Sequence, residues 1–317
     1  MPKLAVLTKT EDTKIAYKIK AISLAKKARK ELEIPTYENL SLKQFVGWLC
    51  AYKNILSYAS WKLYKASVVY FIEENYPDEL EVLEKLKEVT PDNKVKRTLQ
   101  SSNKKMKKFP VSDFIAIVSF LEKSNYKNNI ELKNWLYAGV LTGLRPVEWG
   151  EAKLSEDFSK LIVKNAKNTN GRSHGDFRTI HLEYLSDVEK KYIQEQVKNA
   201  NYYKELGQYE KFQKSCGDLL RTVSKKLYPK RKQHPCLYSL RHQFAADAKA
   251  SGLSREEIAA LMGHAVDDTA TNHYAKKQMG KSFTRVKADP EEVLRIKKVY
   301  TGELFLENVY KNKKKKG

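Results

Sequence analysis

Apolar residues recur at intervals of three and four along most of this chain. The pattern runs through segments 15–25, 42–49, 64–72 and 112–121. Lysine and arginine lie between the apolar positions of the first segment, as in an amphipathic helix. Because a helix brings every third or fourth side chain to one face, this spacing predicts a helix in each segment. We therefore expect a mainly α-helical protein.

One part of the chain departs from the helical pattern. Residues 161–163 are apolar and largely β-branched, and residues 177–182 alternate between polar and apolar. The residues between them include asparagine and two glycines, which favour turns. These features predict a hairpin with a long loop, and so a small antiparallel β-sheet in a mostly helical domain. Four basic residues belong to this hairpin region: Lys164, Lys167, Arg172 and Arg178.

A basic, polar stretch separates two groups of helical segments. Residues 93–108 hold seven Lys and Arg together with serine and asparagine, a composition typical of a flexible linker. The helical pattern resumes at about Ser112, just after Pro110. We therefore expect two domains. A basic helical domain with its linker covers residues 1–108, and a second domain with a C-terminal tail covers residues 109–317.

The charge of the chain is strongly positive. The 317 residues include 60 Lys and Arg against 38 Asp and Glu, a net charge of +22. Such an excess favours a polyanionic partner, most often a nucleic acid. The alternative is a lysine-rich surface that only keeps the protein in solution. Because both predicted domains are basic, a protein that grips its partner from two sides fits better than one with a single basic tail.

Composition also excludes several classes of protein. Three cysteines do not make a disulfide scaffold and are typical of a reducing cytosol. The longest apolar runs are far shorter than the roughly 18 residues of a membrane span, so we expect no membrane partner. No glycine-rich phosphate-binding loop is present, so ATP is not indicated. Cys216, His234 and Cys236 have irregular spacing and lack a fourth ligand, so we predict no metal and no other cofactor.

An arginine lies at a predicted corner between two helices. The apolar helix over 135–141 ends at Gly143, and Pro146 suits the first turn of the next helix. Arg145 is therefore held where its guanidinium can be aimed rigidly. The alternative is a purely structural ion pair with Glu148 or Glu151.

Three further polar residues follow in the second domain. Ser239 is a suitable N-cap, which places Arg241 in a first helical turn where free backbone N–H groups favour a phosphate. The alternative is a solvated helix face. His264 directly follows a helix that ends at Gly263, and an ordinary hydrogen-bonded histidine is the alternative there. Tyr274 lies in a short polar stretch and is one of 19 tyrosines, most of which serve packing or the surface.

The ordered set of these residues is a more specific signal than any single one of them. Arginine, hairpin lysine, arginine, histidine and tyrosine occur in this order within the strings TGLRP, SLRHQFA, LMGH and HYA. The set resembles the tyrosine recombinase (phage integrase-like) family over residues 111–280. Residues 1–108 match only as a basic helical domain, the core-binding domain of that family.

The resemblance implies a site-specific recombinase or integrase that cuts and rejoins DNA without ATP or metal. Tyr274 would attack a DNA phosphodiester and form a 3′-phosphotyrosyl link. Arg145 and Arg241 would clamp the non-bridging oxygens, and His264 would donate to the phosphate. Lys167 would be the general acid for the 5′-oxygen. Two other hairpin residues are alternatives for that acid: Lys164 and Arg172.

One position departs from the family pattern. The family usually has histidine three residues before the second arginine, where this chain has Tyr238. A phenol can hydrogen-bond but is not cationic at neutral pH. The departure keeps a second reading open, a non-catalytic DNA-binding or architectural protein on the same scaffold. A telomere resolvase or a type IB topoisomerase-like enzyme is a third reading.

The resemblance also implies partners and a cellular place. We expect double-stranded DNA and a homotetramer on synapsed DNA, in the nucleoid of the cytoplasm. A monomer in free solution and accessory DNA-bending proteins stay open. The apolar and basic tail over residues 293–316 is either donated to a neighbouring subunit or folded back on its own domain.

Overall fold

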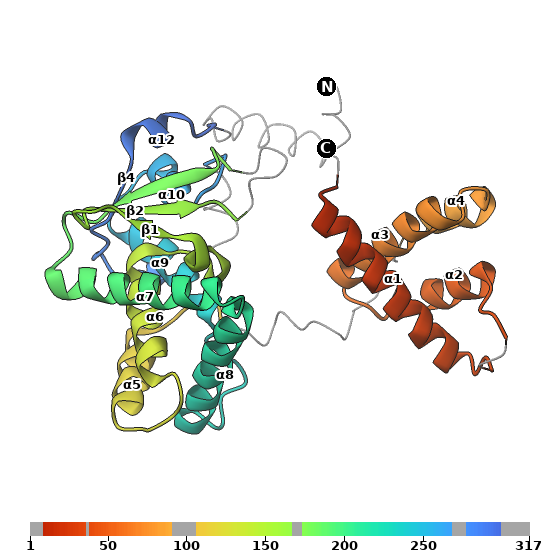
Figure 1. Ribbon diagram of the computed structural model, residues 1–317, viewed down its shortest axis with the longest axis horizontal. Helices are drawn as coiled ribbons and strands as arrows, with labels where there is room; N and C mark the ends of the chain where they lie inside the picture. The colour runs from red at the N-terminus through yellow and green to blue at the C-terminus, as the bar shows by residue number, and fades with distance from the viewer. Residues whose placement is uncertain (1–8, 36–37, 91–105, 167–172, 268–276, 299–317) are drawn as a thin grey trace, which may run out of the picture. The chain divides into compact units, whose positions relative to one another are not determined.

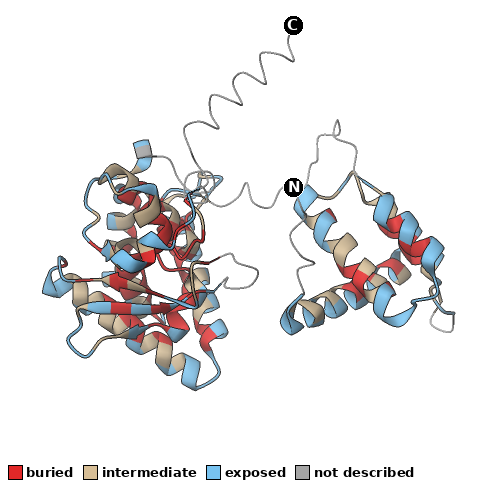
Figure 2. Ribbon diagram, turned by 90° about the horizontal axis from the view of Figure 1, so that it is seen from above, coloured by how far each residue is buried: buried red, intermediate tan, exposed pale blue. Residues whose placement is uncertain are grey.

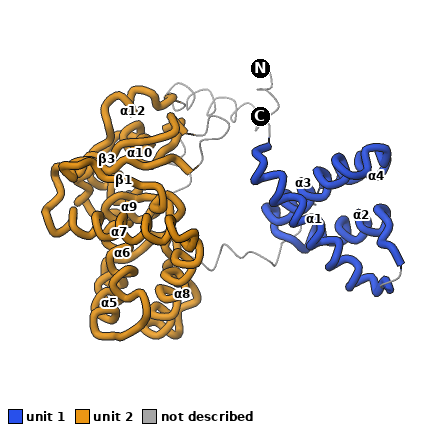
Figure 3. Tube along the Cα trace, viewed as in Figure 1, with its two compact units in different colours: residues 1–102 blue, residues 103–317 orange. Residues whose placement is uncertain are grey.

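A computed structural model describes residues 9–35, 38–90, 106–166, 173–267 and 277–298. The chain divides into two compact units, residues 1–102 and 103–317 (Figure 3). The predicted division after residue 108 stays a prediction, because the passage between the units lies outside the described residues. Phe109 is buried in the second unit, and the backbone N–H of Met106 donates to the carbonyl of His234 there at 3.2 Å.

The described part of the first unit is helical, as predicted. Side-chain hydroxyls of Thr10, Ser41 and Ser57 accept backbone N–H groups and begin three of its helices. Its elements are α1 (Glu11–Glu31), α2 (Leu42–Ala51), α3 (Tyr58–Asn75) and α4 (Leu80–Glu88). Their inner faces pack into a small core that includes Leu49, Trp61 and Ile72.

The apolar spacing of α1 predicts its helix correctly but does not identify its buried face. Ile19 is 64% exposed, and Ile15 and Ile22 are exposed too. The helix instead buries Ala21, Leu24 and Ala28. Figure 2 shows the buried and exposed positions along the helices of each unit. Two small alanines let α1 approach the neighbouring α3 closely, so the isoleucines lie on the outer side.

The second unit is mostly helical and contains one small sheet (Figure 1). Its helices are α5 (Val111–Glu122), α6 (Asn129–Thr142), α7 (Asp187–Glu205), α8 (Tyr209–Leu227), α9 (Leu237–Ala250), α10 (Arg255–Leu261) and α12 (Pro290–Leu294). The described residues of this unit also form two short 3-10 helices, η2 (Pro146–Glu151) and η4 (Lys277–Met279). The predicted fold class, a helical protein with a small antiparallel sheet, is confirmed.

The sheet contains the predicted hairpin and two further strands. The strands β1 (Lys153–Leu154), β2 (Lys160–Lys164), β3 (Phe177–His181) and β4 (Lys287–Ala288) pair antiparallel in that order. β1 and β4 have two residues each, which is too short for an alternating pattern to be recognised. In the hairpin, Val163 pairs with Arg178. The sheet, α10 and α12 lie at one end of the unit, and α5 and α8 lie at the other (Figure 1).

Two central helices connect these ends. Trp135 and Leu136 of α6 are buried, and α6 packs against both α7 and α9. α9 is buried around almost its whole circumference, since Leu237, Leu240 and Phe244 are buried as well as the polar residues between them. A helix enclosed in this way can hold a charged side chain inside the protein only if that side chain has partners.

Candidate active site

Arg145 lies at the corner that the sequence predicts. α6 ends at Gly143, whose φ of 67° is a left-handed conformation. A Cβ atom at this position would lie 2.2 Å from Cδ1 of Phe244, so glycine is also required for space. Arg145 then precedes η2, which begins at Pro146. The tight turn brings the guanidinium to the first turns of α9.

Glu148 holds Arg145 from inside the protein. The carboxylate accepts the backbone N–H of Arg145 at 2.7 Å and its Nη1 at 2.5 Å. The Glu148 side chain is fully buried and Arg145 is only 6% exposed. The ion pair with Glu148 is therefore present. Glu151, the other suggested partner, instead pairs with Lys164 and Lys204 at the surface.

Arg241 is completely buried, which contradicts a solvated helix face. Its Nη1 donates to the carbonyl of Gly143 at 2.8 Å, and Nη2 donates to the carbonyl of Met262 at 2.5 Å. Nη1 also lies 3.8 Å from a carboxylate oxygen of Glu148. Arg145 and Arg241, almost one hundred positions apart in sequence, therefore share one carboxylate.

His264 completes the cluster. Its Nε2 lies 3.2 Å from Nη2 of Arg241, and the residue is 3% exposed. Burial, followed by the nearby guanidinium charges, above all that of Arg241, lowers the pKa of His264 to about 2. The imidazole is therefore neutral near pH 7.

A third arginine, Arg178 of β3, belongs to the cluster although the sequence analysis assigned it no role. Its Nη2 donates to Glu148 at 2.6 Å and its Nη1 donates to Oδ1 of Asn165 at 2.5 Å. A signal was present in the sequence. Arg178 occupies the same strand face as Ile180, and this inward face would normally carry only apolar residues.

The carboxylate at the centre remains ionised. Burial by itself raises the pKa of Glu148, but the charges of the three guanidiniums outweigh burial and hold the pKa well below its ordinary value. Three guanidiniums, one carboxylate and one neutral imidazole thus meet in a buried place. The positive charge exceeds the negative charge by two, which suits an anionic ligand.

The two segments with the remaining predicted residues lie outside the described residues. Tyr274 and Lys167 belong to them, and so does the alternative acid Arg172. The backbone N–H of Ala166, next to Lys167, lies 3.4 Å from Glu148. At the other end of the same loop, Nδ1 of His174 lies 3.3 Å from the carbonyl of His264. The residues on both sides of this undescribed segment, Ala166 and His174, therefore lie at the cluster.

Lys164 and Tyr238 are the two other predicted residues that the structure describes. Lys164 has a 55% exposed side chain and pairs with Glu151 at 2.8 Å. Tyr238 is half-buried in the first turn of α9, and its ring meets the ring of His242 edge-on with centroids 5.3 Å apart. Burial, followed by the charge of Lys107, lowers the pKa of His242 to about 4. Tyr238 therefore has a neutral neighbour near pH 7.

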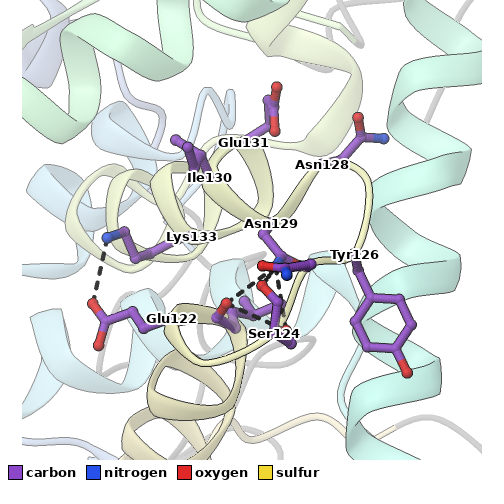
Figure 4. Close-up of a pocket in the computed structure, with 10 residues that line it drawn as sticks. Glu122, Ser124, Tyr126, Asn128, Asn129, Ile130, Glu131 and Lys133 are labelled. Atoms are coloured by element: carbon purple, nitrogen blue, oxygen red, sulfur yellow. Dashed lines mark hydrogen bonds and ion pairs between the residues drawn. The ribbon is translucent and has the colours of Figure 1, made fainter.

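A separate cavity lies between α5 and α6 and is not part of this cluster. It has a volume of about 490 Å³, and Lys133 pairs with Glu122 at its rim (Figure 4). The cavity adjoins Asn129 at the start of α6, whereas Arg145 follows the end of that helix. A helix of 14 residues is about 21 Å long, so the two places are far apart.

The described residues contain no group of three or more His, Cys, Asp and Glu side chains placed to hold a metal ion. In the same part of the chain, no helix combines the length and the apolar character that crossing a bilayer requires.

Comparisons with known proteins identify the fold. No protein-family model matches the sequence, and no curated protein matches it either. Among solved structures, the Tn1549 transposon integrase in complex with circular intermediate DNA is similar, with a TM-score of 0.51 at 14% identity. That match covers 84% of this chain and 91% of the integrase. The chain has the tyrosine recombinase fold.

Two further solved structures with the tyrosine recombinase fold are similar to a lesser degree. A lambda integrase dimer bound to a core site matches at 16% identity and a TM-score of 0.49, over 88% of this chain and 74% of that chain. The XerH site-specific recombinase bound to its difH substrate matches at 17% identity and a TM-score of 0.46, over 84% and 77%.

Proposed function

We propose that this protein is a site-specific DNA recombinase or integrase, which cuts and rejoins DNA through a 3′-phosphotyrosyl intermediate. The observation that carries the proposal is the meeting of Arg145 and Arg241 at one buried carboxylate, with His264 next to Arg241. These residues come from three distant segments of a chain with a net charge of +22. The fold and the order of motifs in the sequence support the same activity.

The charge of the cluster suits this chemistry. A phosphodiester carries one negative charge, and the pentavalent transition state of its cleavage carries two. Two fixed guanidiniums can stabilise the added charge without reorganising. Because His264 is neutral near pH 7, it acts as a hydrogen-bond donor and adds no charge of its own.

The reaction divides into two transfers. The phenolic oxygen of Tyr274 forms a bond to phosphorus while the bond from phosphorus to the 5′-oxygen breaks. Lys167 donates a proton to the leaving 5′-oxygen, and the phenol releases its own proton to water as it attacks. In the second transfer a 5′-hydroxyl attacks the phosphotyrosine and releases Tyr274. The energy of the broken bond is retained in the covalent intermediate, so neither ATP nor metal is needed.

Double-stranded DNA is the proposed partner, bound as a synapsed complex by a homotetramer. The positive charge of both units supports DNA as the partner, because phosphate contacts dominate such binding and make it dependent on salt. Accessory DNA-bending proteins remain an expectation from the resemblance.

The proposal can be tested without knowing the target sequence. Fragments of the source genome are incubated with the protein and treated with denaturing detergent, and DNA that stays attached is sequenced. We expect one recurrent sequence, attached through Tyr274, and its loss in Tyr274→Phe. Tyr202→Phe, which changes an exposed tyrosine of α7, is the matched control and should keep the adduct.

The absence of any detergent-resistant adduct from the wild-type chain, or an adduct that persists in Tyr274→Phe, would contradict the proposal. Tyr238 supports the second candidate, a DNA-binding protein without catalysis. That protein would bind the selected fragments but form no adduct. A topoisomerase-like enzyme would relax generic supercoiled plasmid, whereas a site-specific recombinase requires its own site.

A further inference from the structure

Arg178 is enclosed by protein acceptors. It is fully buried on the inward face of β3 and makes four hydrogen bonds. Nε donates to the carbonyl of Leu261 at 2.9 Å, and Nη1 donates to Asn165. Nη1 and Nη2 also donate to the two carboxylate oxygens of Glu148, at 3.3 and 2.6 Å. A guanidinium with these partners is not available to bind a phosphate itself.

Glu148 has two opposing effects on the phosphate clamp. It orients Arg145 through two hydrogen bonds and lies within 4 Å of Arg241. Its negative charge also offsets part of the positive charge that a phosphate would meet. In a buried site this offset is large, because charges interact more strongly there than in water.

We propose that Arg178 is a positioning residue that neutralises Glu148, so that Arg145 and Arg241 act on the phosphate with their full double positive charge. The inference rests on the proposed function and adds a residue to it. Glu148 can then orient the clamp without weakening it.

If Arg178 has this role, the rate of DNA cleavage should depend on its positive charge. The scissile phosphate gains one negative charge between the ground state and the transition state, so the charge of Arg178 should matter more for the rate than for DNA affinity. A purely structural role, in which Arg178 only ties β3 to η2 and α10, would not depend on the charge of the substrate.

The test compares two substrates. One is the selected DNA site with its natural phosphodiester, and the other carries an uncharged methylphosphonate at the scissile position. The rate of adduct formation is measured in a single turnover, and DNA affinity is measured separately. For Arg178→Met we expect a rate about 10- to 100-fold lower on the phosphodiester, as for other residues that act through a neighbour. DNA affinity should stay within about threefold. The loss should be smaller on the methylphosphonate, because its transition state carries one negative charge instead of two, and the single excess positive charge that remains without Arg178 matches it.

A double variant protects the test against simple misfolding. Arg178→Met with Glu148→Gln removes both members of a buried ion pair, which proteins tolerate better than the loss of one. The double variant also restores the cluster's excess of two positive charges. We therefore expect it to recover part of the rate on the phosphodiester, and to recover the wild-type ratio of the phosphodiester rate to the methylphosphonate rate. The inference would be overturned if Arg178→Met lost the same factor in rate on both substrates. It would also be overturned if the double variant had a ratio of the two rates different from that of the wild type.

Arg285→Met is the matched control. Arg285 pairs with Glu189 on the surface of the same unit, so its loss removes one guanidinium without touching the cluster. It should leave both rates unchanged.

A second readout needs no DNA and separates this inference from the proposed function. Sulfate, a dianion, should raise the temperature of unfolding of the wild-type chain at constant ionic strength. Arg178→Met should show a smaller rise, and the double variant should regain it. A wild-type chain that forms no DNA adduct contradicts the proposed function alone. An equal rise with sulfate in wild type and Arg178→Met contradicts the role of Arg178.

Discussion

Nη2 of Arg241 lies 3.2 Å from Nε2 of His264 inside the protein. A guanidinium can only donate hydrogen bonds, so Nε2 must accept, and the proton of the neutral imidazole lies on Nδ1. A second proton on His264 would lie beside the charge of Arg241 in a buried place. The pair therefore explains why this histidine stays neutral, and it sets the form in which His264 meets a ligand.

The neutral state of His264 predicts how stability depends on pH. In the unfolded chain a histidine binds a proton below about pH 6.5, whereas folded His264 has a pKa of about 2. Between these values the unfolded state holds more protons, so the free energy of unfolding falls as pH falls. The contribution of this residue approaches about 1.4 kcal/mol per pH unit.

Urea unfolding of the full chain at pH 7, 6 and 5 measures this effect. His264→Asn should show a shallower loss of stability than the wild type over this range. Tyr202→Phe, which changes an exposed tyrosine of α7, should keep the wild-type slope. Identical slopes for wild type and His264→Asn would show that the histidine is protonated in the folded protein.

The shared carboxylate predicts a large loss of stability in Glu148→Ala. This variant leaves three buried guanidiniums without their common partner, and breaking a buried pair by removing one member costs about 3–5 kcal/mol. Glu151→Ala removes a carboxylate of the same η2 segment that pairs with two exposed lysines, and should cost about 0–1 kcal/mol. Denaturant unfolding compares the two, and a similar cost for both would contradict the central role of Glu148.

Gly263→Ala should destabilise the protein through both backbone strain and a steric clash. Gly252→Ala introduces the strain alone, so a comparison of the two variants separates these effects. The φ of Gly263 is 63°, and a Cβ there would lie 2.3 Å from Oδ1 of Asn165 and 2.9 Å from Nη1 of Arg178. Gly252 has a φ of 82° and no atom within 4 Å of such a Cβ. Gly252→Ala should therefore cost only the left-handed conformation, about 1–2 kcal/mol.

Gly263→Ala should cost the same strain and, in addition, about 1–3 kcal/mol for displacing packed atoms. The difference between the two variants in thermal or urea unfolding measures the contact itself. If Gly263→Ala were no more destabilising than Gly252→Ala, the close packing of the glycine against Asn165 and Arg178 would be refuted.

The hairpin lysines predict different effects on DNA cleavage. On the proposed mechanism, Lys167→Met should slow cleavage about 10²- to 10⁴-fold, the usual contribution of a general acid. A substrate with sulfur in place of the 5′-bridging oxygen should restore the rate, because a thiolate leaves without a proton. Lys164→Met should cleave at nearly the wild-type rate, since Lys164 is engaged with Glu151.

The same measurement decides between the alternatives for the acid. A thiol-leaving substrate that rescues Arg172→Met or Lys164→Met, and does not rescue Lys167→Met, would move the role to the rescued residue.

Local patterns predicted part of the secondary structure, whereas α4, α7 and α8 were not assigned from the sequence. Intervals of three and four identified α1, α2, α3 and α5, and alternation identified the hairpin of β2 and β3. The C-cap of α6 at Gly143 was also predicted correctly. The N-cap of α9 was not, because it is Cys236 and the expected Ser239 lies inside the helix, which makes Arg241 the fifth helical residue instead of one in the first turn. The correctly predicted features depend on residues close together in the chain, so the sequence contains all the information that they need. The two-residue strands β1 and β4 depend on distant partners and left no pattern.

The sequence by itself determined that the protein is basic and mainly helical, and it marked Arg145, Arg241 and His264 as residues to bring together. Only the tertiary structure decided which carboxylate the two arginines share and that Arg178 joins them. Periodicity reports which face of an element is apolar, and it cannot report that α9 is buried on almost every side or that Ile19 of α1 faces outward. The partner of a buried charge comes from another segment, and its identity is decided when those segments pack.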